Sequence, residues 1–234
     1  MSDMDSPHMG MSDMVLESEE DLTFGVCRYL AGTIGVSKTA FQITEGQYLP
    51  LHSSSANKMK KIAVYCSASF EIDPKYNKVA REFVRAASLR GYGIVTGGTI
   101  KGTMGEVSDE LHACGGYHLG IIPRFMKEYV HPNLSEVIWT DTMAERKTLL
   151  REGTCAVVAL PGGVGTLDEL IENVALVHLK QYFGKMAVLN HDGFYEPLRA
   201  LLDHYVTTGM MPQSTRDKVL FADTPEELLQ MLEN

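Results

Sequence analysis

Cysteine is scarce in this sequence, with four in 234 residues. Cys27, Cys66, Cys114 and Cys155 are far apart, and they form no C-x-x-C pair and have no histidine at metal-ligand spacing. This argues against a zinc site and against a disulfide framework, so no metal is predicted. Cys66 and Cys155 lie in apolar runs typical of buried strands, and we expect inert core thiols there.

Long apolar runs are also missing. The longest ones fall far short of the roughly 20 residues that a membrane-spanning helix needs. The N-terminus is acidic, whereas a signal or transit peptide would be basic. We therefore expect a cytoplasmic protein with no membrane partner.

Positive charge is in short supply, because 21 Lys and Arg face 30 Asp and Glu, for a net charge of -9. Affinity for nucleic acid depends on neutralising many backbone phosphates, and this charge has the wrong sign. A single small phosphate needs only a local positive potential. The composition thus argues against a nucleic-acid partner but permits a nucleotide.

The acidic excess is concentrated in residues 1–57, which hold eight acidic and two basic residues. Residues 1–20 have a composition typical of disorder, and residues 6–10 resemble a remnant of a cloning vector. Residues 22–51 contain enough apolar side chains for a helix or hairpin, and residues 53–57 are typical of a linker. We predict an N-terminal extension over 1–57 and a single domain over 58–234.

Within that domain, short β-branched apolar runs alternate with amphipathic stretches of helical length. The pattern is typical of an α/β fold with a Rossmann-like, doubly wound parallel sheet and helices on both faces. Ligands of such sheets bind beyond the carboxyl ends of the strands. The predicted strands are 62–66, 93–96, 118–122, 137–139, 156–160, 187–189 and 219–221, and the predicted helices are 74–90, 103–114, 142–152, 166–180, 195–207 and 225–232.

Two glycine-rich loops each connect a predicted strand to a predicted helix, Thr96-Gly-Gly-Thr-Ile-Lys-Gly-Thr-Met-Gly105 and Pro161-Gly-Gly-Val-Gly-Thr166. Glycines there let backbone N–H groups approach a phosphate at a helix N-terminus. Neither loop matches the Walker pattern or G-x-G-x-x-G, so a nucleoside triphosphate and NAD are poor candidates. A tight turn without a ligand explains one such loop, but two in one sheet favour a phosphate site.

Two further segments match the capping box S/T-x-x-E, namely Thr142 to Glu145 and Thr166 to Glu169. In a capping box the two side chains satisfy backbone donors at a helix N-terminus. Spacing alone would make Glu169 a structural residue and Arg146 a solvated arginine. Local pattern does not decide between these roles and functional ones.

The combination of motifs resembles the LOG ("lonely guy") family of cytokinin-activating phosphoribohydrolases. Pro161 to Glu169 fits the PGGxGTxxE motif residue for residue, and Glu145-Arg146-Lys147 fits the ERK element. The resemblance runs from about Lys61 to Asn234, and it includes Tyr65–Ser69, Gly120–Pro123, Glu128 with His131, and Leu189–Tyr195. Two departures, Thr99 in place of a third glycine and Thr103 in place of a leucine, could alter base preference.

The resemblance implies an enzyme that hydrolyses the N-glycosidic bond of a purine nucleoside 5'-monophosphate, of the N6-modified cytokinin type, to free base and ribose 5-phosphate. It implies no cofactor, a homodimer, and Arg146 and Glu169 as the catalytic pair. The expected substrate contacts are Gly162, Gly163, Gly165 and Thr166, together with Lys147, Glu128, Gly97, Gly98, Met104 and Gly105.

The residue chemistry is compatible with these roles. A carboxylate such as Glu169 can stabilise an oxocarbenium-like transition state and orient water, and the permanently charged Arg146 can clamp phosphate or ribose oxygens. Apolar residues of the helix over 166–180 suit dimer burial and core packing about equally: Leu170, Val174, Val177 and Leu179.

Three other functions remain open. One is a general AMP or purine-nucleotide nucleosidase, and another is a non-catalytic nucleotide-binding or cofactor-carrier protein on the same fold. The third is a lysine decarboxylase, a label sometimes given to PGGxGTxxE proteins. It would need a lysine for pyridoxal phosphate, and neither Lys101 nor Lys147 has a suitable context.

Overall fold

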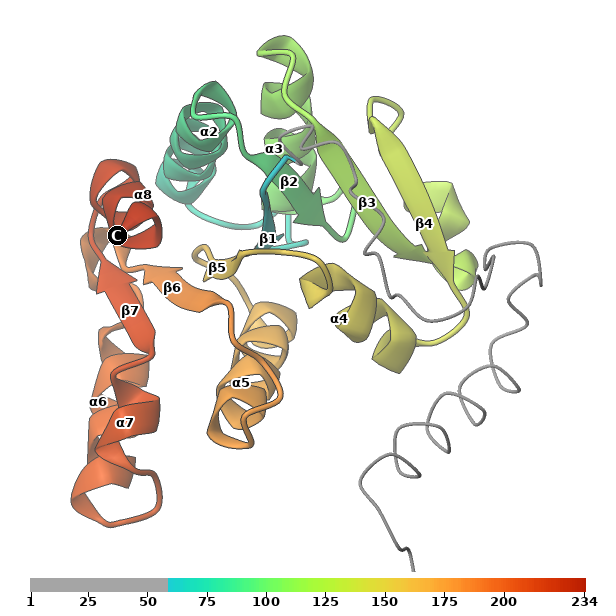
Figure 1. Cartoon of the computed structure of the whole chain (residues 1–234). Helices are drawn as coiled ribbons and strands as arrows, with labels where there is room; N and C mark the ends of the chain where they lie inside the picture. Colours follow the sequence, from blue (N-terminus) through green and yellow to red (C-terminus); the bar gives the residue numbers. More distant parts are fainter. Residues whose placement is uncertain (1–58) are drawn as a thin grey trace, which may run out of the picture. The chain divides into compact units, whose positions relative to one another are not determined.

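The structure, a computed structural model, describes residues 59–234 (Figure 1). Predictions for the extension over 1–57 lie outside the described residues. Seven parallel strands form one sheet in the order β4-β3-β2-β1-β5-β6-β7, which confirms the predicted fold class. All seven predicted strands are present: β1 (Lys61–Tyr65), β2 (Gly93–Thr96), β3 (His118–Pro123), β4 (Glu136–Thr140), β5 (Ala156–Ala159), β6 (Lys185–Leu189) and β7 (Val219–Ala222).

The order of the strands creates one topological switch point. The chain winds outward from β1 to β4 and then returns to the opposite side of β1, where β5 pairs with it from Ile62↔Ala156 to Tyr65↔Ala159. A doubly wound sheet has its ligand crevice at such a point, beyond the carboxyl ends of the two strands. The glycine-rich loop 161–166 follows β5 and therefore lies at this crevice.

Helices cover both faces of the sheet (Figure 1). Apolar side chains on α2 (Pro74–Leu89), α3 (Gly102–Ala113) and α8 (Pro225–Glu233) pack on one face, and those on α4 (Met143–Arg151), α5 (Val164–His178) and α6 (Glu196–Thr207) pack on the other. The six predicted helices are thus confirmed, with ends that differ by one or two residues. Three short elements were not predicted: η1 (Arg124–Tyr129), η2 (His191–Gly193) and α7 (Gln213–Arg216).

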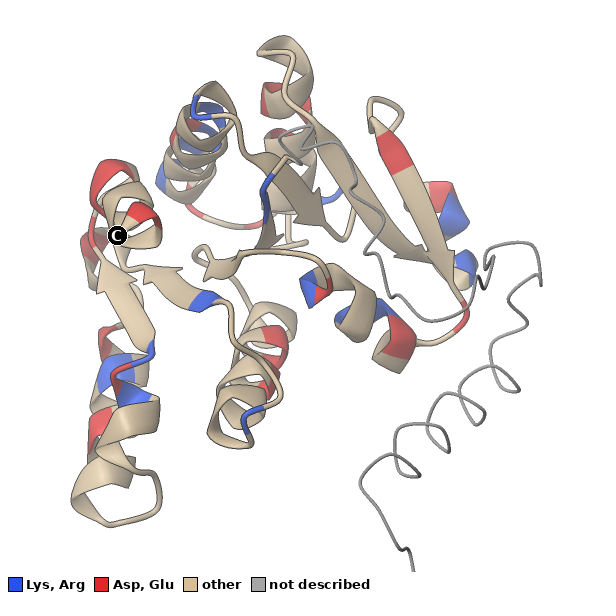
Figure 2. Cartoon of the chain, in the orientation of Figure 1, with Lys and Arg blue, Asp and Glu red and all other residues tan. Residues whose placement is uncertain are grey.

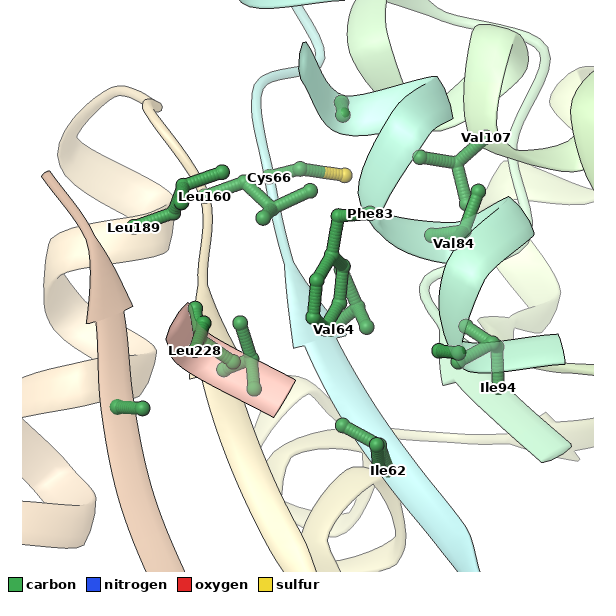
Figure 3. Close-up of a cluster of buried hydrophobic side chains, with 14 of the residues drawn as sticks. Ile62, Val64, Cys66, Phe83, Val84, Ile94, Val107, Leu160, Leu189 and Leu228 are labelled. Carbon is green, nitrogen blue, oxygen red and sulfur yellow. The ribbon is translucent and has the colours of Figure 1, made fainter. Parts of the chain in front are cut away.

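The core explains why the strands were predictable. Ile62 and Val64 belong to the apolar cluster that includes Phe83 of α2 on one face (Figure 3). Ala63 and Tyr65 belong to the cluster on the opposite face. Strands buried on both faces need nearly continuous apolar runs, and this distinguishes them clearly from amphipathic helices. Charged residues accordingly lie mainly on the helices (Figure 2).

Cys155 corrects one prediction. Cys66 is buried, as expected, but Cys155 is exposed. Cys155 is the residue directly before β5. Its backbone N–H still donates to Lys61 O of β1 at 2.8 Å, so it lies at the end of the hydrogen-bond ladder between the two strands. The helices cover the middle of the sheet, so a side chain just before a strand can reach solvent. In the part of the chain that the structure describes, no helix is long and apolar enough to cross a membrane.

His118 makes the stability of the fold depend on pH. It is 1% exposed, its Nε2 lies 2.8 Å from Thr96 Oγ1, and burial, together with the nearby His131, lowers its pKa to about 3. An unfolded histidine binds a proton near pH 6.5, so below that pH the unfolded state holds more protons. We expect His118 to reduce the free energy of unfolding as the pH falls from about 6.5 toward 3, by about 2 kcal/mol at pH 5.

Urea unfolding at pH 7.5 and pH 5 checks this expectation. His118→Gln is the matched variant, because an amide can still bond to Thr96 but does not titrate. The variant should lose less stability between the two pH values than the wild type. Equal losses in both proteins would show that other groups cause the acid sensitivity.

Candidate active site

Arg146 of α4 and Glu169 of α5 form a nearly buried ion pair. Arg146 Nη1 donates to Glu169 Oε1 at 3.0 Å, and the two side chains are 9% and 13% exposed. Arg146 Nε also donates to the carbonyl oxygen of Ile121 in β3 at 3.1 Å. The structure therefore brings together the two residues predicted as a catalytic pair and fixes the guanidinium on two sides.

The turn before α4 explains how Arg146 reaches the site. Thr142 is the N-cap and its Oγ1 accepts from Glu145 N at 3.1 Å, while Glu145 Oε2 accepts from Asp141 N at 2.8 Å. The capping interaction predicted for Thr142 and Glu145 is thus confirmed. The next position points inward, because Arg146 is 7% exposed, so the interpretation of Arg146 as a solvated arginine is wrong.

Burial also changes the acidity of Glu169. It raises the pKa of the Glu169 carboxyl above its ordinary value, and the positive charge and hydrogen bond of Arg146 oppose the rise. A carboxylate with a raised pKa is a better proton acceptor. Glu169 Oε1 is occupied by Arg146, and no hydrogen bond to Oε2 is formed within residues 59–234. That second oxygen is available to a water molecule.

The loop after β5 has the features of a phosphate site. Helix α5 begins at Val164 with Gly163 as N-cap and without a side-chain cap, so the capping box proposed for Thr166 and Glu169 is wrong. The first-turn N–H groups consequently lack side-chain acceptors. Thr166 Oγ1 is buried and has no partner within residues 59–234.

The glycines of this loop differ in their surroundings. A Cβ on Gly162 would lie 2.2 Å from Thr166 Oγ1, so this glycine is required by packing. A Cβ on Gly163 or Gly165 would meet nothing within 4 Å. Protein packing does not explain these two glycines, whereas close approach of a ligand would.

The loop after β2 packs against the side chain of Arg146. A Cβ on Gly97 would lie 2.0 Å from Arg146 Nη2 and 2.9 Å from Met104 Sδ. Gly98 has φ +62° and packs on Gly120, and a Cβ on Gly105 would lie 2.5 Å from the carbonyl oxygen of Ile100. Gly97 and Met104 are thus close to Arg146, while Gly98 packs on Gly120 and Gly105 packs on Ile100.

Lys147 and Glu128 occupy different surroundings. Lys147 Nζ lies 2.6 Å from Glu172 Oε2 and 3.2 Å from Asp168 Oδ2, so it ties α4 to α5 on both sides of Glu169. Glu128 lies exposed in η1, after β3, and forms no ion pair within residues 59–234. The structure does not bring Glu128 into contact with Arg146 or Glu169, and its role as a substrate contact stays a prediction.

Three supporting residues were not identified from the sequence. Asn173 Nδ2 donates to the carbonyl oxygen of Glu169 at 2.7 Å and to Tyr65 Oη at 3.0 Å. Tyr195 Oη donates at 2.7 Å to the carbonyl oxygen of Leu160, next to the glycine-rich loop. The two tyrosines lie in segments that match the family, but no pattern distinguishes Asn173 from other polar residues of a helix.

The fold and the site define a Rossmann-like α/β protein with an arginine–carboxylate pair near its topological switch point. A family model described as "Possible lysine decarboxylase" matches residues 104–232. A cytokinin riboside 5'-monophosphate phosphoribohydrolase of Arabidopsis thaliana is 35% identical over 179 residues, 76% of this chain and 78% of that protein. One from Mycobacterium marinum is 33% identical over 171 residues, 72% of this chain and 91% of that protein.

The chain belongs to the LOG family of cytokinin riboside 5'-monophosphate phosphoribohydrolases, whose members so named are N-glycosyl hydrolases. A solved structure of a molybdenum cofactor binding protein from Rippkaea orientalis is similar with a TM-score of 0.58 and 24% identity, and the match covers 75% of this chain and 96% of that one. At this identity the likeness shows the fold alone.

The residues do not fit the pyridoxal phosphate chemistry that a lysine decarboxylase would use. A Schiff-base lysine must lose its proton readily. The carboxylates of Glu172 and Asp168 instead raise the pKa of Lys147, and the Lys101 ammonium lies 3.5 Å from the centroid of the Tyr129 ring, packed on that aromatic face. Among residues 59–234, no group of three or more His, Cys, Asp and Glu side chains is arranged to hold a metal ion.

Proposed function

We propose that this chain hydrolyses the N-glycosidic bond of purine nucleoside 5'-monophosphates and releases the base and ribose 5-phosphate. The observation that carries the proposal is the buried pair of Arg146 and Glu169 close to a glycine-rich helix N-terminus with space for a phosphate. A binding protein needs the loop, but it has no need of a carboxylate kept beside an arginine and out of water.

The geometry supports a simple division of labour. The 5'-phosphate binds the N–H groups of the first turn of α5 and the hydroxyl of Thr166, which would then gain the partner it lacks. The ribose extends toward Glu169, whose Oε2 orients water while the carboxylate stabilises positive charge developing on the sugar. Arg146 holds that carboxylate in place and contacts sugar or phosphate oxygens.

The rim of the site supports a base with an apolar substituent, such as an N6-modified adenine. A large apolar residue exposed to solvent lies in each loop or first helical turn that follows one of the strands β1 to β5: Phe70, Ile100, Phe125, Met143 and Val164. Because the carboxyl ends of parallel strands share one edge of the sheet, these residues lie at the same edge as the two glycine-rich loops. Covering them with an apolar group would remove apolar surface from water.

Chromatography of the free base released from AMP and from isopentenyladenosine 5'-monophosphate tests both parts of the proposal. We expect base and ribose 5-phosphate from both, with the higher kcat/KM for the prenylated nucleotide. A higher value for AMP would favour a general purine-nucleotide nucleosidase. Binding of either nucleotide by calorimetry without release of base would replace the enzyme with a nucleotide-binding protein.

Gly165→Ala separates a phosphate site from a tight turn. Alanine is the better helix former and its Cβ enters open space, so the melting temperature should stay the same or rise. In a phosphate site the methyl group would obstruct the ligand, and KM should increase about 10-fold with little change in kcat, which corresponds to about 1.4 kcal/mol of binding. Unchanged steady-state constants would show that this glycine serves the turn alone.

We also propose a homodimer that uses the exposed apolar residues of α5 and its C-cap. Of the two roles that the sequence left open for this helix, Leu170 and Val174 have the core-packing one, because both are buried in the chain's own core, and Val177 packs partly against that core. Leu179 is 61% exposed. Three apolar residues of α5 are exposed as well: Val164, Leu167 and Ile171. Light scattering measures the molar mass of wild type and of Ile171→Glu, and the introduced charge should convert the dimer into a monomer. If the variant kept the dimeric mass, the interface would lie elsewhere.

A further inference from the structure

A cavity lies away from Arg146 and Glu169, at the C-terminal end of α5. Its volume is about 490 Å³, and it is bounded by the last turn of α5, the loop before β6 and the segment that contains α7. His178 in its wall is nine residues beyond Glu169, a separation of about 14 Å along the helix. A cavity of this volume can hold a small organic molecule.

The wall of this cavity is positively charged. Lys180 and Lys218 line it, and no Asp or Glu does. Neither lysine forms an ion pair within residues 59–234, although sixteen such pairs occur there. Two uncompensated ammonium groups in a chain of net charge -9 make this wall a local site of positive potential.

The remainder of the wall is mostly apolar. Val177, Phe183 and Pro212 contribute to it, and the Phe183 side chain is 86% exposed. Ser214 and Thr215 add hydroxyl groups, and Thr215 Oγ1 lies 3.2 Å from His178 Nδ1. An aromatic side chain left in water beside ammonium groups favours a ligand that offers both a flat apolar body and a negative charge.

Lys180 also has an unusual backbone. Its φ is +57°, and it follows Leu179, the C-cap of α5, at the position where a helix commonly ends with glycine. A side chain with a Cβ is strained in this left-handed region. The chain thus places a lysine where glycine would be more stable, and such an outlier supports a functional role for the side chain.

We propose that this cavity binds a small organic anion with an aromatic or apolar body, such as an aromatic carboxylate. The carboxylate pairs with Lys180 and Lys218, and the ring lies against Phe183 and Pro212. The site is separate from the catalytic pair, and the proposal does not depend on the proposed hydrolysis.

Nuclear magnetic resonance of the full-length, ¹⁵N-labelled chain tests the proposal with three probes. Benzoate has the ring and the charge, benzyl alcohol has the ring alone, and acetate has the charge alone. Benzoate should give saturable shifts confined to residues 177–184 and 212–218, with an affinity at least about 10-fold higher than either comparison probe. Absence of saturation, or shifts centred elsewhere, would overturn the site.

Two substitutions assign the charges. Lys180→Gly should weaken benzoate binding about 10-fold while raising the melting temperature by about 3 °C, so that loss of binding cannot be ascribed to unfolding. Lys218→Ala should weaken binding by a similar factor. Lys78→Ala removes an exposed charge from α2 and should leave binding unchanged. If this control lost as much affinity as the other two variants, the loss would come from the net charge of the chain, and the proposal would be contradicted.

Discussion

Glu169→Gln should lower kcat for release of base from a nucleoside 5'-monophosphate by about 10³-fold, with KM changed little. Glutamine has the shape of glutamate and can still accept a hydrogen bond from Arg146, but it is neutral. It cannot stabilise positive charge on the ribose or accept a proton from water. The 13% exposure of the Glu169 side chain makes the effect large, because water cannot substitute for the missing charge.

Steady-state kinetics of base release measure this effect, and Asp168→Asn is the matched control. Asp168 precedes Glu169 and loses the same charge, but its side chain is 59% exposed and pairs with Lys147 rather than Arg146. The control should retain kcat within about threefold. If Glu169→Gln kept more than about a tenth of the activity, a different group would have to supply the charge.

The pH dependence of base release also tests the role of Glu169. The proposed reaction needs Glu169 as a carboxylate, and burial raises the pKa of that group. The rate should therefore fall as the pH decreases through the raised pKa, at a higher pH than an exposed glutamate would require. Glu169→Gln should remove this acidic limb from any residual activity.

The strands were predictable because burial on both faces of the sheet leaves a direct trace in the sequence. Ile62 to Tyr65 must pack in alternation against two layers of helices, so no polar residue interrupts the run. The short η1, η2 and α7 leave no such trace, since a single turn has no period. Helix α5 starts two residues earlier than expected because Gly163, not Thr166, is its N-cap.

That Arg146 and Glu169 belong to one site was predictable from motifs and not from spacing. Thr142 and Thr166 show the same S/T-x-x-E pattern, yet only Thr142 caps a helix. The difference depends on where the preceding strand ends and on how the glycine-rich loop leaves it, and neither is a local property. The hydrogen bond of Arg146 to Ile121 and that of Tyr195 to Leu160 join residues 25 and 35 positions apart, which no local pattern could indicate.

Gly97→Ala should lower kcat about 10²-fold while leaving the fold intact. A Cβ at this position would lie 2.0 Å from Arg146 Nη2, and its other close neighbours belong to the side chain of Met104. The flexible thioether can move, but the guanidinium can do so only by giving up its bonds to Glu169 and Ile121. Gly165→Ala, the comparable substitution in the other glycine-rich loop, should instead increase KM.

A double-mutant cycle with Arg146→Ala shows whether the effect passes through the guanidinium. Arg146→Ala alone should be strongly impaired, and adding Gly97→Ala should then cost little more, because the atom it displaces has been removed. The measurement is kcat/KM for base release by the four proteins, with thermal unfolding as a check on folding. Should Gly97→Ala lower kcat/KM by the same factor in both backgrounds, Gly97 would act independently of Arg146, and the loop after β2 would have to contact the substrate directly.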